Sequence, residues 1–408
     1  MELETLKRKT WTAYLRKNGA KGIRNKILVI YTVECASFVA KEIGSHFRNG
    51  PYDVDVIGFP GCTDNEYAVR MLLAFIRHPN VGAIVTIGLG CEYIQAHLLA
   101  EKAEEAGKPA RALLIQESGG TQKTIELGTE AVHKVAQELQ KVTVTTEMDF
   151  SDLIIGAECG GSDFTSGLAG NVVVGHFYDW LVDNGGTAIF EEIVEAIGLR
   201  DLLISRGKDE KAKEQLAQTY DKMLAYCQSV RQYSVSPGNF VGGLTTIEEK
   251  SMGAFAKSGS RPIEGVLKVA ETPPNNGLWL LDTTPDPHFM QFGYTNPNDN
   301  EGLTALAASG AHLLLMVTGR GTVVGNAVAP VIKITGNEQT YQRMSDDIDF
   351  CSGAMLTGEK DLKTLVRELA EQIAETCQGK KTKAEQLGHK EYFIPYKYQT
   401  PAVLACER

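Results

Sequence analysis

The chain lacks the features that mark membrane and secreted proteins. Its 408 residues contain no apolar run approaching the roughly 18 residues of a membrane-spanning helix. The first ten residues are charged and have no apolar core of the signal-peptide kind. We therefore expect a cytoplasmic protein that does not bind membranes. In that compartment the eight cysteines are not expected to form disulfides.

An excess of basic residues is also missing. Lys and Arg number 41 against 51 Asp and Glu, which gives a formal net charge of −10. Nucleic-acid binding needs a basic face, so we expect no nucleic-acid partner. The sequence has no GxGxxG after its first expected strand, no GxxxxGK[ST] and no GxSxG. These absences argue against a dinucleotide-binding fold, a P-loop and a nucleophile elbow.

What the sequence does contain is an alternation of strand and helix patterns. Apolar runs of strand length are followed by segments with helical spacing. The strands are expected at Lys26–Val33, Val54–Phe59, Val81–Leu89 and Ala110–Gln116, and the helices at Ala36–Arg48, Asn65–His78, Tyr93–Ala106 and Thr121–Lys141. Such a pattern predicts an α/β protein with mostly parallel, doubly wound sheets.

The remainder of the chain is less regular but shows the same element types. Strands are expected at Asp152–Ala157, Thr187–Glu191, Leu278–Asp282, His312–Val317 and Val331–Thr335, and helices at Asn171–Asn184, Asp209–Gln228, Ile247–Lys257 and Leu362–Cys377. The length suits two α/β domains. We place their boundary in a short linker, with an N-terminal domain over residues 1–145 and a C-terminal catalytic domain over residues 146–408.

Four cysteines follow expected strands: Cys35 in YTVEC, Cys62 in GFPGC, Cys91 in GLGCE and Cys159 in GAECGGSD. Ligands of open α/β sheets bind beyond the carboxyl ends of the strands. If the strands are neighbours, the thiols gather at one edge, where thiolates suit iron, zinc or an iron–sulfur cluster. The alternative is that each cysteine is a small residue packed in the core.

Glycine loops and fixed charges mark further candidates. Ser162 and Asp163 lie in ECGGSD, whose backbone could approach an anion at a helix start; the alternative is an ordinary strand–helix turn. Arg320 in GRGT and Arg24 in GIRN are placed to bind a carboxylate with both guanidinium arms, or else are surface turn residues.

Two lysines are candidates for a base. Lys257 in KSGS ends an expected helix, where a lysine can simply favour the helix C-terminus. Lys333 lies in the apolar strand PVIKI, and an unpaired buried ammonium is costly. That lysine is either snorkelling to water or functional, and the sequence does not decide between the two lysines.

Taken together, these motifs resemble those of the altronate/galactarate dehydratase family, whose members dehydrate sugar acids. The matching segments run in family order over about residues 14 to 353: NGAKGIRN, YTVEC, FPGC, GLGCE, ECGGSD, PGNFVGGL, EEKSMGAFAKSGS, TGRGT, PVIKI and DDIDFCSG.

The chain departs from the family pattern in three respects. Family members that act alone carry an N-terminal β-rich SAF domain, whereas this chain starts at the large catalytic portion. Gly58 stands where sugar-acid dehydratases of this kind carry a histidine, and Cys351 stands where they carry an asparagine. Both replacements lie in expected active-site loops and bear on the choice of substrate.

The resemblance implies a lyase acting on a 2-hydroxy acid. A base removes the proton next to the carboxylate and water leaves the β-carbon, giving a 2-keto-3-deoxy sugar acid. It also implies a divalent metal, Fe2+ first and Mn2+ second, with an iron–sulfur cluster less expected. The roles that follow are catalytic for Lys257, Lys333 and Asp163, substrate-binding for Arg24, Asn25, Ser162, Ser258 and Arg320, and metal-ligating for Cys62, Cys91, Glu92 and Cys159.

Partners and alternatives follow from the same resemblance. We expect a small acidic substrate, a separate small SAF-domain subunit and a homo-oligomer. A split arrangement is also how sulfolactate sulfo-lyase looks, so a large subunit that releases sulfite and pyruvate is the competing interpretation. An inactive scaffold or regulatory homologue is a third, because Gly58 and Cys351 replace polar family residues.

Overall fold

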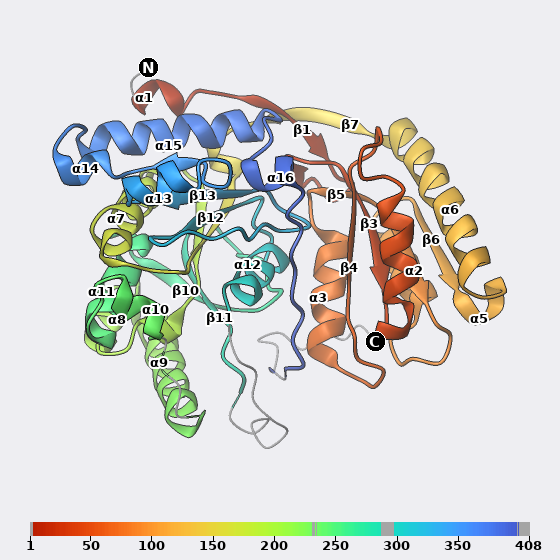
Figure 1. Ribbon diagram of the computed structural model, residues 1–408, viewed down its shortest axis with the longest axis horizontal. Helices are drawn as coiled ribbons and strands as arrows, with labels where there is room; N and C mark the ends of the chain where they lie inside the picture. The colour runs from red at the N-terminus through yellow and green to blue at the C-terminus, as the bar shows by residue number, and fades with distance from the viewer. Residues whose placement is uncertain (1–2, 231–232, 234, 287–297, 398, 400–408) are drawn as a thin grey trace.

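Figure 1 shows the computed structural model, in which two parallel sheets lie side by side and helices cover their faces. The structure describes residues 3–230, 233, 235–286, 298–397 and 399. The expected α/β class with mostly parallel, doubly wound sheets is confirmed. Among the described residues, none of the helices combines the length and the apolar character that a membrane crossing needs.

The first sheet has four parallel strands in the order β4-β3-β5-β6. They span Val54–Gly58, Lys26–Tyr31, Val81–Gly88 and Ala110–Leu114. Strands β3 and β5 are buried along their whole length, as expected when helices cover both faces of a parallel sheet. One face packs against α2 and α6, and the other against α3 and α4 (Glu34–Ser45, Thr121–Val142, Glu66–Arg77 and Ala96–Glu105).

The second sheet has seven parallel strands in the order β10-β11-β9-β8-β12-β13-β14. They span Ile263–Lys268, Gly277–Asp282, Thr187–Phe190, Ile154–Cys159, Leu313–Val317, Val331–Thr335 and Phe350–Cys351. One face packs on α7, α9 and α15 (Asn171–Asp183, Glu210–Val230 and Leu362–Cys377). On the other face α12 (Asp299–Ala308) lies between the two sheets, against α3.

Three short strands form an antiparallel sheet that the sequence reading missed. Strand β1 (Trp11–Leu15) pairs with both β2 (Lys21–Gly22) and β7 (Val144–Met148). The supposed linker around residue 145 is therefore a strand, because its backbone finds hydrogen-bonding partners more than 120 residues away, and alternation alone gives such a short exposed strand no signal. The boundary between residues 145 and 146 falls inside β7, and the division into two domains stays a prediction.

Most expected elements are present, with ends shifted by a few residues. Strand β10 and helix α12 were not expected, since their sequences show weak periodicity. The remaining short helices are α1 Leu3–Leu6, α5 Ile115–Ser118, η1 Phe150–Asp152, η2 Ser166–Gly170, η3 Ile193–Glu195, α8 Arg200–Ser205, α10 Pro237–Val241, α11 Ile247–Phe255, η4 Ala256–Ser258, α13 Glu338–Arg343, α14 Ala354–Thr357 and α16 Lys383–Leu387.

Each large sheet has a topological switch point, where successive strands begin to be added on the opposite side. In the first sheet the chain runs from β3 outward to β4 and then returns to add β5 and β6 on the other side. In the second it leaves β8 towards β9, β11 and β10, and returns to add β12, β13 and β14. Ligands of such sheets bind in the crevice at the switch point, beyond the carboxyl ends of the strands.

Buried polar groups join the two sheets at their amino ends. The Asn80 side chain donates to the carbonyl of His312 at 2.9 Å, and the His78 ring bonds to the carbonyl of Ala311 at 3.2 Å. His312 Nδ1 accepts from the backbone N–H of Ile154 at 2.9 Å. These bonds fix the second sheet against the loop that precedes β5, and they require His312 to be neutral.

Because these hydrogen bonds require a neutral His312, we expect the protein to lose stability in acid. Burial lowers the pKa of His312 to about 4, whereas an unfolded histidine titrates near 6.5. Between these values the unfolded chain binds a proton that the folded chain does not, so the free energy of unfolding falls as pH falls. His312 alone contributes on the order of 3 kcal/mol across this window.

Urea unfolding from pH 7.5 to 4 checks this expectation. His312→Gln, which keeps an acceptor for Ile154, flattens the profile relative to the native protein. The pKa of His78 is also lowered by burial, so part of the slope persists. His46→Gln changes an exposed histidine and serves as the matched control. An equal slope in the His312 variant and the native protein would contradict the assignment.

Candidate active site

A pocket of about 530 Å³ opens at the switch point of the seven-stranded sheet. Its walls come from the segments that follow β8, β9, β11 and β12. The side chains lining it are rich in acids: Glu158, Glu191, Glu192, Glu195, Asp299 and Glu301. Two cationic side chains, Lys250 and Arg320, also line it. This is the place in the fold where a small ligand is expected to bind.

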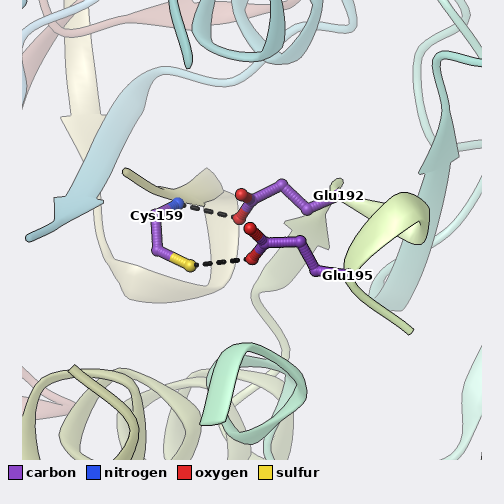
Figure 2. Close-up of side chains that lie close together, drawn as sticks. All are labelled: Cys159, Glu192 and Glu195. Carbon is purple, nitrogen blue, oxygen red and sulfur yellow. Dashed lines mark hydrogen bonds between the residues drawn. The ribbon is translucent and has the colours of Figure 1, made fainter. Parts of the chain in front are cut away.

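One wall of the pocket brings together a thiol and two carboxylates. Figure 2 shows Cys159, at the end of β8, pointing toward Glu192 and Glu195. The three side chains offer ligand atoms that all lie within 4.8 Å of one another, and all three are buried. The backbone N–H of Cys159 donates to Glu192 Oε2 at 2.8 Å, and its Sγ lies 3.3 Å from Glu195 Oε2. The group is compact enough to hold one metal ion.

The backbone at Glu192 is strained. Its φ of 50° puts a residue with a long side chain in the left-handed region, which costs free energy for any residue but glycine. Glu192 follows β9 directly and precedes η3, which carries Glu195. This sharp turn directs both carboxylates toward Cys159. The strained backbone conformation therefore places the two carboxylates beside the thiol.

Two lysines balance the negative charge of this group. Lys257 forms an ion pair with Glu192, and its Nζ lies 3.3 Å from Cys159 Sγ. Lys250 Nζ lies 2.5 Å from a carboxylate oxygen of Glu195. Burial, with the charge of Glu195, raises the pKa of the Cys159 thiol to about 11. The thiol therefore keeps its proton and donates a hydrogen bond to Glu195.

Three further carboxyl groups in the pocket differ in protonation. Burial and the nearby charge of Glu191 raise the pKa of Glu158 well above its ordinary value, and burial also raises that of Glu191. Burial raises the pKa of Asp299 to about 6. Asp299 is therefore ionised at neutral pH, whereas the raised pKa of Glu158 favours its protonated form. Environments that separate two carboxyl groups in this way are typical of an acid and base pair.

Two of the sequence-predicted site residues line the pocket. They are Cys159 and Arg320, whose exposed guanidinium donates to the carbonyl of Gly238 at 3.0 Å. Lys257 lies just behind the wall, 2% exposed, and reaches the pocket through Glu192 and Cys159.

The other predicted catalytic residues lie elsewhere. Lys333 is fully buried in β13 and does not line the pocket, and its ammonium has no hydrogen-bond partner among the described residues. Asp163 accepts hydrogen bonds from Thr165 and Asn337, which consumes both carboxylate oxygens. Its position is that of a loop support, because a carboxylate with satisfied oxygens has little left to offer a substrate.

The predicted substrate-binding residues are likewise engaged in structural contacts. Arg24 pairs with Glu385 at 2.8 Å and gives its other N–H groups to backbone carbonyls. Asn25 bonds to Arg16 and Thr143, and Ser258 to Arg206 and a backbone carbonyl. Ser162 is buried, and its Oγ has no partner among the described residues. These contacts place Arg24, Asn25 and Ser258 in the framework.

The four predicted metal ligands do not form one site. Cys62 and Cys91 follow strands of the four-stranded sheet, whereas Cys159 follows a strand of the seven-stranded sheet. Glu92 is buried, and its carboxylate accepts from Thr32 and from the backbone N–H groups of Leu89 and Gly90. The premise that all four cysteine-bearing strands are neighbours was wrong, because they belong to two sheets.

Sequence reasoning assigned a role to none of the six acids in the pocket, nor to Lys250. A signal was available for one pair: Glu191 ends the expected strand and Glu192 follows it, much as the cysteines follow theirs. Glu195, Lys250 and Asp299 gave no such signal. They come from a short 3-10 helix, a helix and a helix start, and only the folded chain brings them to one pocket.

Comparison with known proteins adds the family context. Residues 150–400 match the family described as D-galactarate/Altronate dehydratase, C-terminal, and residues 13–140 match D-galactarate dehydratase/Altronate hydrolase, second domain. The chain is 32% identical to altronate dehydratase of Escherichia coli, over 93% of this chain and 76% of that protein. It is 31% identical to the (2R)-sulfolactate sulfo-lyase subunit beta of Chromohalobacter salexigens, over 97% and 99%. Galactarate dehydratase of Escherichia coli is 31% identical over 78% and 61%.

The lysine behind the pocket wall yields a stability prediction. Lys257→Met removes the ammonium and leaves Glu192 buried beside the other acids, and we expect a loss of about 3 kcal/mol in the free energy of unfolding. The double variant Lys257→Met/Glu192→Gln recovers most of that loss, since it removes the uncompensated charge as well.

Urea unfolding at pH 7 measures both variants. The matched control is Arg261→Ala, which breaks an exposed ion pair with Asp183 and costs less than about 1 kcal/mol. A Lys257→Met protein no less stable than this control would show that the Lys257–Glu192 pair does not hold the wall together.

Proposed function

Because the chain belongs to the D-galactarate/altronate dehydratase family, a family of lyases, we propose that it eliminates water from a sugar acid with a 2-hydroxy group. The observation that carries this proposal is the pocket at the second switch point. There a compact group of metal-donor atoms shares the pocket with Asp299, which is ionised at neutral pH, and with Glu158, whose pKa burial raises. Elimination next to a carboxylate needs these three components: a cation, a base and an acid.

Substrate binding would begin at the mouth of the pocket. Arg320 is the exposed cationic side chain there, and a guanidinium can bind a carboxylate through two parallel hydrogen bonds. Its backbone N–H donates to Gly161, and its side chain to Gly238, so two loops fix its position. The acidic side chains that line the rest of the pocket would then face the hydroxyl-bearing carbons of a sugar acid.

The residues present fit a divalent cation. One thiolate and two carboxylates suit ferrous iron or manganese, which accept mixed sulfur and oxygen ligands. Cys159, Glu192 and Glu195 would hold the ion, and Lys250 and Lys257 would keep the two carboxylates in place. Bound there, the ion would supply Lewis-acid polarisation of the substrate carboxylate and so stabilise the enediolate.

Proton transfer is assigned to two carboxyl groups. Asp299, ionised at neutral pH, would accept the proton from the carbon next to the carboxylate. Glu158, whose raised pKa favours the protonated form, would donate its proton to the departing hydroxyl group so that water leaves. The elimination forms a carbon–carbon double bond and so gives an enol, which tautomerises to the 2-keto acid. Lys257 is a positioning residue in this scheme, since its ammonium is engaged by Glu192 and Cys159.

Release of sulfite from sulfolactate is the second candidate function, and one observation supports it. The match to the sulfolactate sulfo-lyase subunit covers almost its full length, whereas altronate dehydratase extends beyond the match by about a quarter of its length. Loss of sulfite would use the same cation and the same base. Proton donation by Glu158 would matter less for this reaction, because sulfite leaves as an anion without prior protonation.

A separate small subunit is part of the proposal. One relative is named as a subunit of a larger enzyme, and exposed apolar side chains border the pocket. Phe240 and Val241 lie on α10, whose Gly238 and Asn239 line the pocket, and Phe164 follows the loop bonded to that helix. A partner covering these side chains would also exclude water from the mouth. The SAF nature of that partner, homo-oligomer formation and a cytoplasmic location stay predictions.

The test is an anaerobic assay of the chain with ferrous iron, with and without a candidate small subunit. The substrates are altronate, galactarate and sulfolactate. We expect a 2-keto-3-deoxy acid from a sugar acid and no sulfite. Sulfite released from sulfolactate without sugar-acid turnover would replace the first function with the second. A protein that binds neither iron nor manganese and turns over nothing would favour the scaffold hypothesis.

The acid and base roles predict the pH profile. The rate with saturating substrate is expected to fall as pH drops through about 6, because Asp299 must be ionised to accept a proton. Asp299→Asn should lower kcat by about 100-fold or more, which is the usual contribution of a general base, and should remove this acid limb.

The same assay separates catalysis from folding. Asp221→Asn changes an exposed aspartate on α9 and is the matched control for charge loss. Iron content and melting temperature are recorded for each variant. An Asp299→Asn protein that binds iron and keeps both its rate and its acid limb would assign the base to another group.

A further inference from the structure

The exposed cysteines are concentrated at one edge of the fold. Seven of the eight cysteines lie in the described residues, and three of these seven are exposed: Cys35, Cys62 and Cys91. Each follows a strand of the four-stranded sheet, after β3, β4 and β5 respectively. Exposed free thiols are a chemical liability on a protein surface. Three at the same sheet edge therefore suggest a ligand.

These cysteines surround the first switch point. The segments after β3 and β5, the two strands at this switch point, carry Cys35 and Cys91. Cys62 follows β4, the other neighbour of β3. The second sheet places Cys159 and the proposed active site at its own switch point. The four-stranded sheet thus has a ligand-binding position of the same topological kind, and its cysteines occupy it.

Hydrogen bonds tie the three cysteine segments together. The backbone N–H of Glu34 donates to Pro60 at 3.1 Å, which joins the Cys35 and Cys62 segments. That of Tyr93 donates to the carbonyl of Cys62 at 3.0 Å, which joins the Cys62 and Cys91 segments. Thr32 Oγ1 donates to the buried Glu92 at 2.5 Å. These hydrogen bonds fix the segments that carry the three cysteines, and none of them uses a cysteine thiol.

Local backbone geometry also suits a ligand at this edge. Cys35 is the second residue of the 12-residue helix α2 and so lies in the first turn of that helix. Gly90, just before Cys91, has a φ of 130°, a conformation that other residues rarely adopt. This φ, rather than any fixed neighbouring atom, is why the tight turn that presents Cys91 favours glycine.

The spacing of the thiols decides which ligand fits. A single metal ion bound at about 2.3 Å holds its sulfur ligands within about 4.6 Å of one another. Among the described residues, the only group of three potential ligands within 4.8 Å is the one at Cys159, so these three thiols are farther apart. An iron–sulfur cluster places iron and sulfide between its cysteines and so spans a wider ring of thiolates.

We propose that Cys35, Cys62 and Cys91 bind an iron–sulfur cluster of the [4Fe–4S] type, with one iron left without a protein ligand. Such clusters take cysteine thiolates, one to each iron, and three cysteines leave the fourth iron open. The site is separate from the cation site at Cys159 and does not depend on the proposed function.

The C-terminal segment connects this site with the pocket. Tyr396 hydroxyl lies 2.8 Å from Thr63 Oγ1, next to Cys62, and Lys397 forms a buried ion pair with Glu301 in the pocket wall. Loss of the cluster would loosen the Cys62 segment and, through these two neighbouring residues, the position of Glu301.

The experiment is anaerobic reconstitution of the full chain with iron, sulfide and a thiol reductant, followed by desalting. We expect visible charge-transfer absorption, acid-labile sulfide in proportion to iron, and an electron paramagnetic resonance signal after reduction. Cys35→Ser, Cys62→Ser and Cys91→Ser should each lower bound sulfide at least several-fold. Cys351→Ser, a half-buried cysteine outside the site, should keep it.

Further variants and controls keep the proposal testable on its own. Cys159→Ser should keep the full cluster signal while losing the cation of the proposed active site, so the two sites fail independently. Far-ultraviolet circular dichroism confirms that each variant is folded. Iron bound without sulfide would overturn the cluster in favour of a single-ion site. Native protein that binds no sulfide, or folded cysteine variants that retain it, would overturn the proposal outright.

Discussion

Burial of charge at the carboxyl edge of the seven-stranded sheet is the constraint on which the site depends. Glu192, Glu195 and Glu301 are all nearly inaccessible to water, and an unpaired carboxylate there would be strongly destabilising. Each carboxylate is paired with a lysine from a distant part of the chain: Lys257, Lys250 and Lys397 in turn. These pairs hold the strained turn at Glu192 and draw the C-terminal segment against the pocket.

The two sheets have the same kind of switch point, but the surroundings of their cysteines differ. Both reverse their strand order beside the first strand, and both place cysteines beyond that point. At Cys159 acids and lysines surround a buried thiol in the pocket. At Cys35, Cys62 and Cys91 the thiols are exposed. The proposed single cation and the proposed cluster thus differ in the burial of their cysteine ligands.

The departures from the family pattern have a structural basis at one position. Gly58 ends β4 beside Tyr31, and a Cβ there would lie 2.4 Å from the Tyr31 carbonyl oxygen. Tyr31 in turn is fixed by a hydrogen bond of 2.6 Å from the hydroxyl of Tyr392. A histidine could not be accommodated without moving this strand pair.

The sequence by itself determined most strands and helices of the two parallel sheets, the α/β class and the family, because hydrophobic periodicity and ordered motifs are local properties of the chain. It also placed Cys159 and Arg320 near a strand end, where the structure has them in the pocket. Only the tertiary structure decided which strand ends are neighbours, and so it separated Cys159 from Cys62 and Cys91. It assigned Arg24 to Glu385, more than 350 residues away, and brought Asp299 to the pocket. Such pairings depend on strand order and on burial of charge, which are properties of the folded chain as a whole.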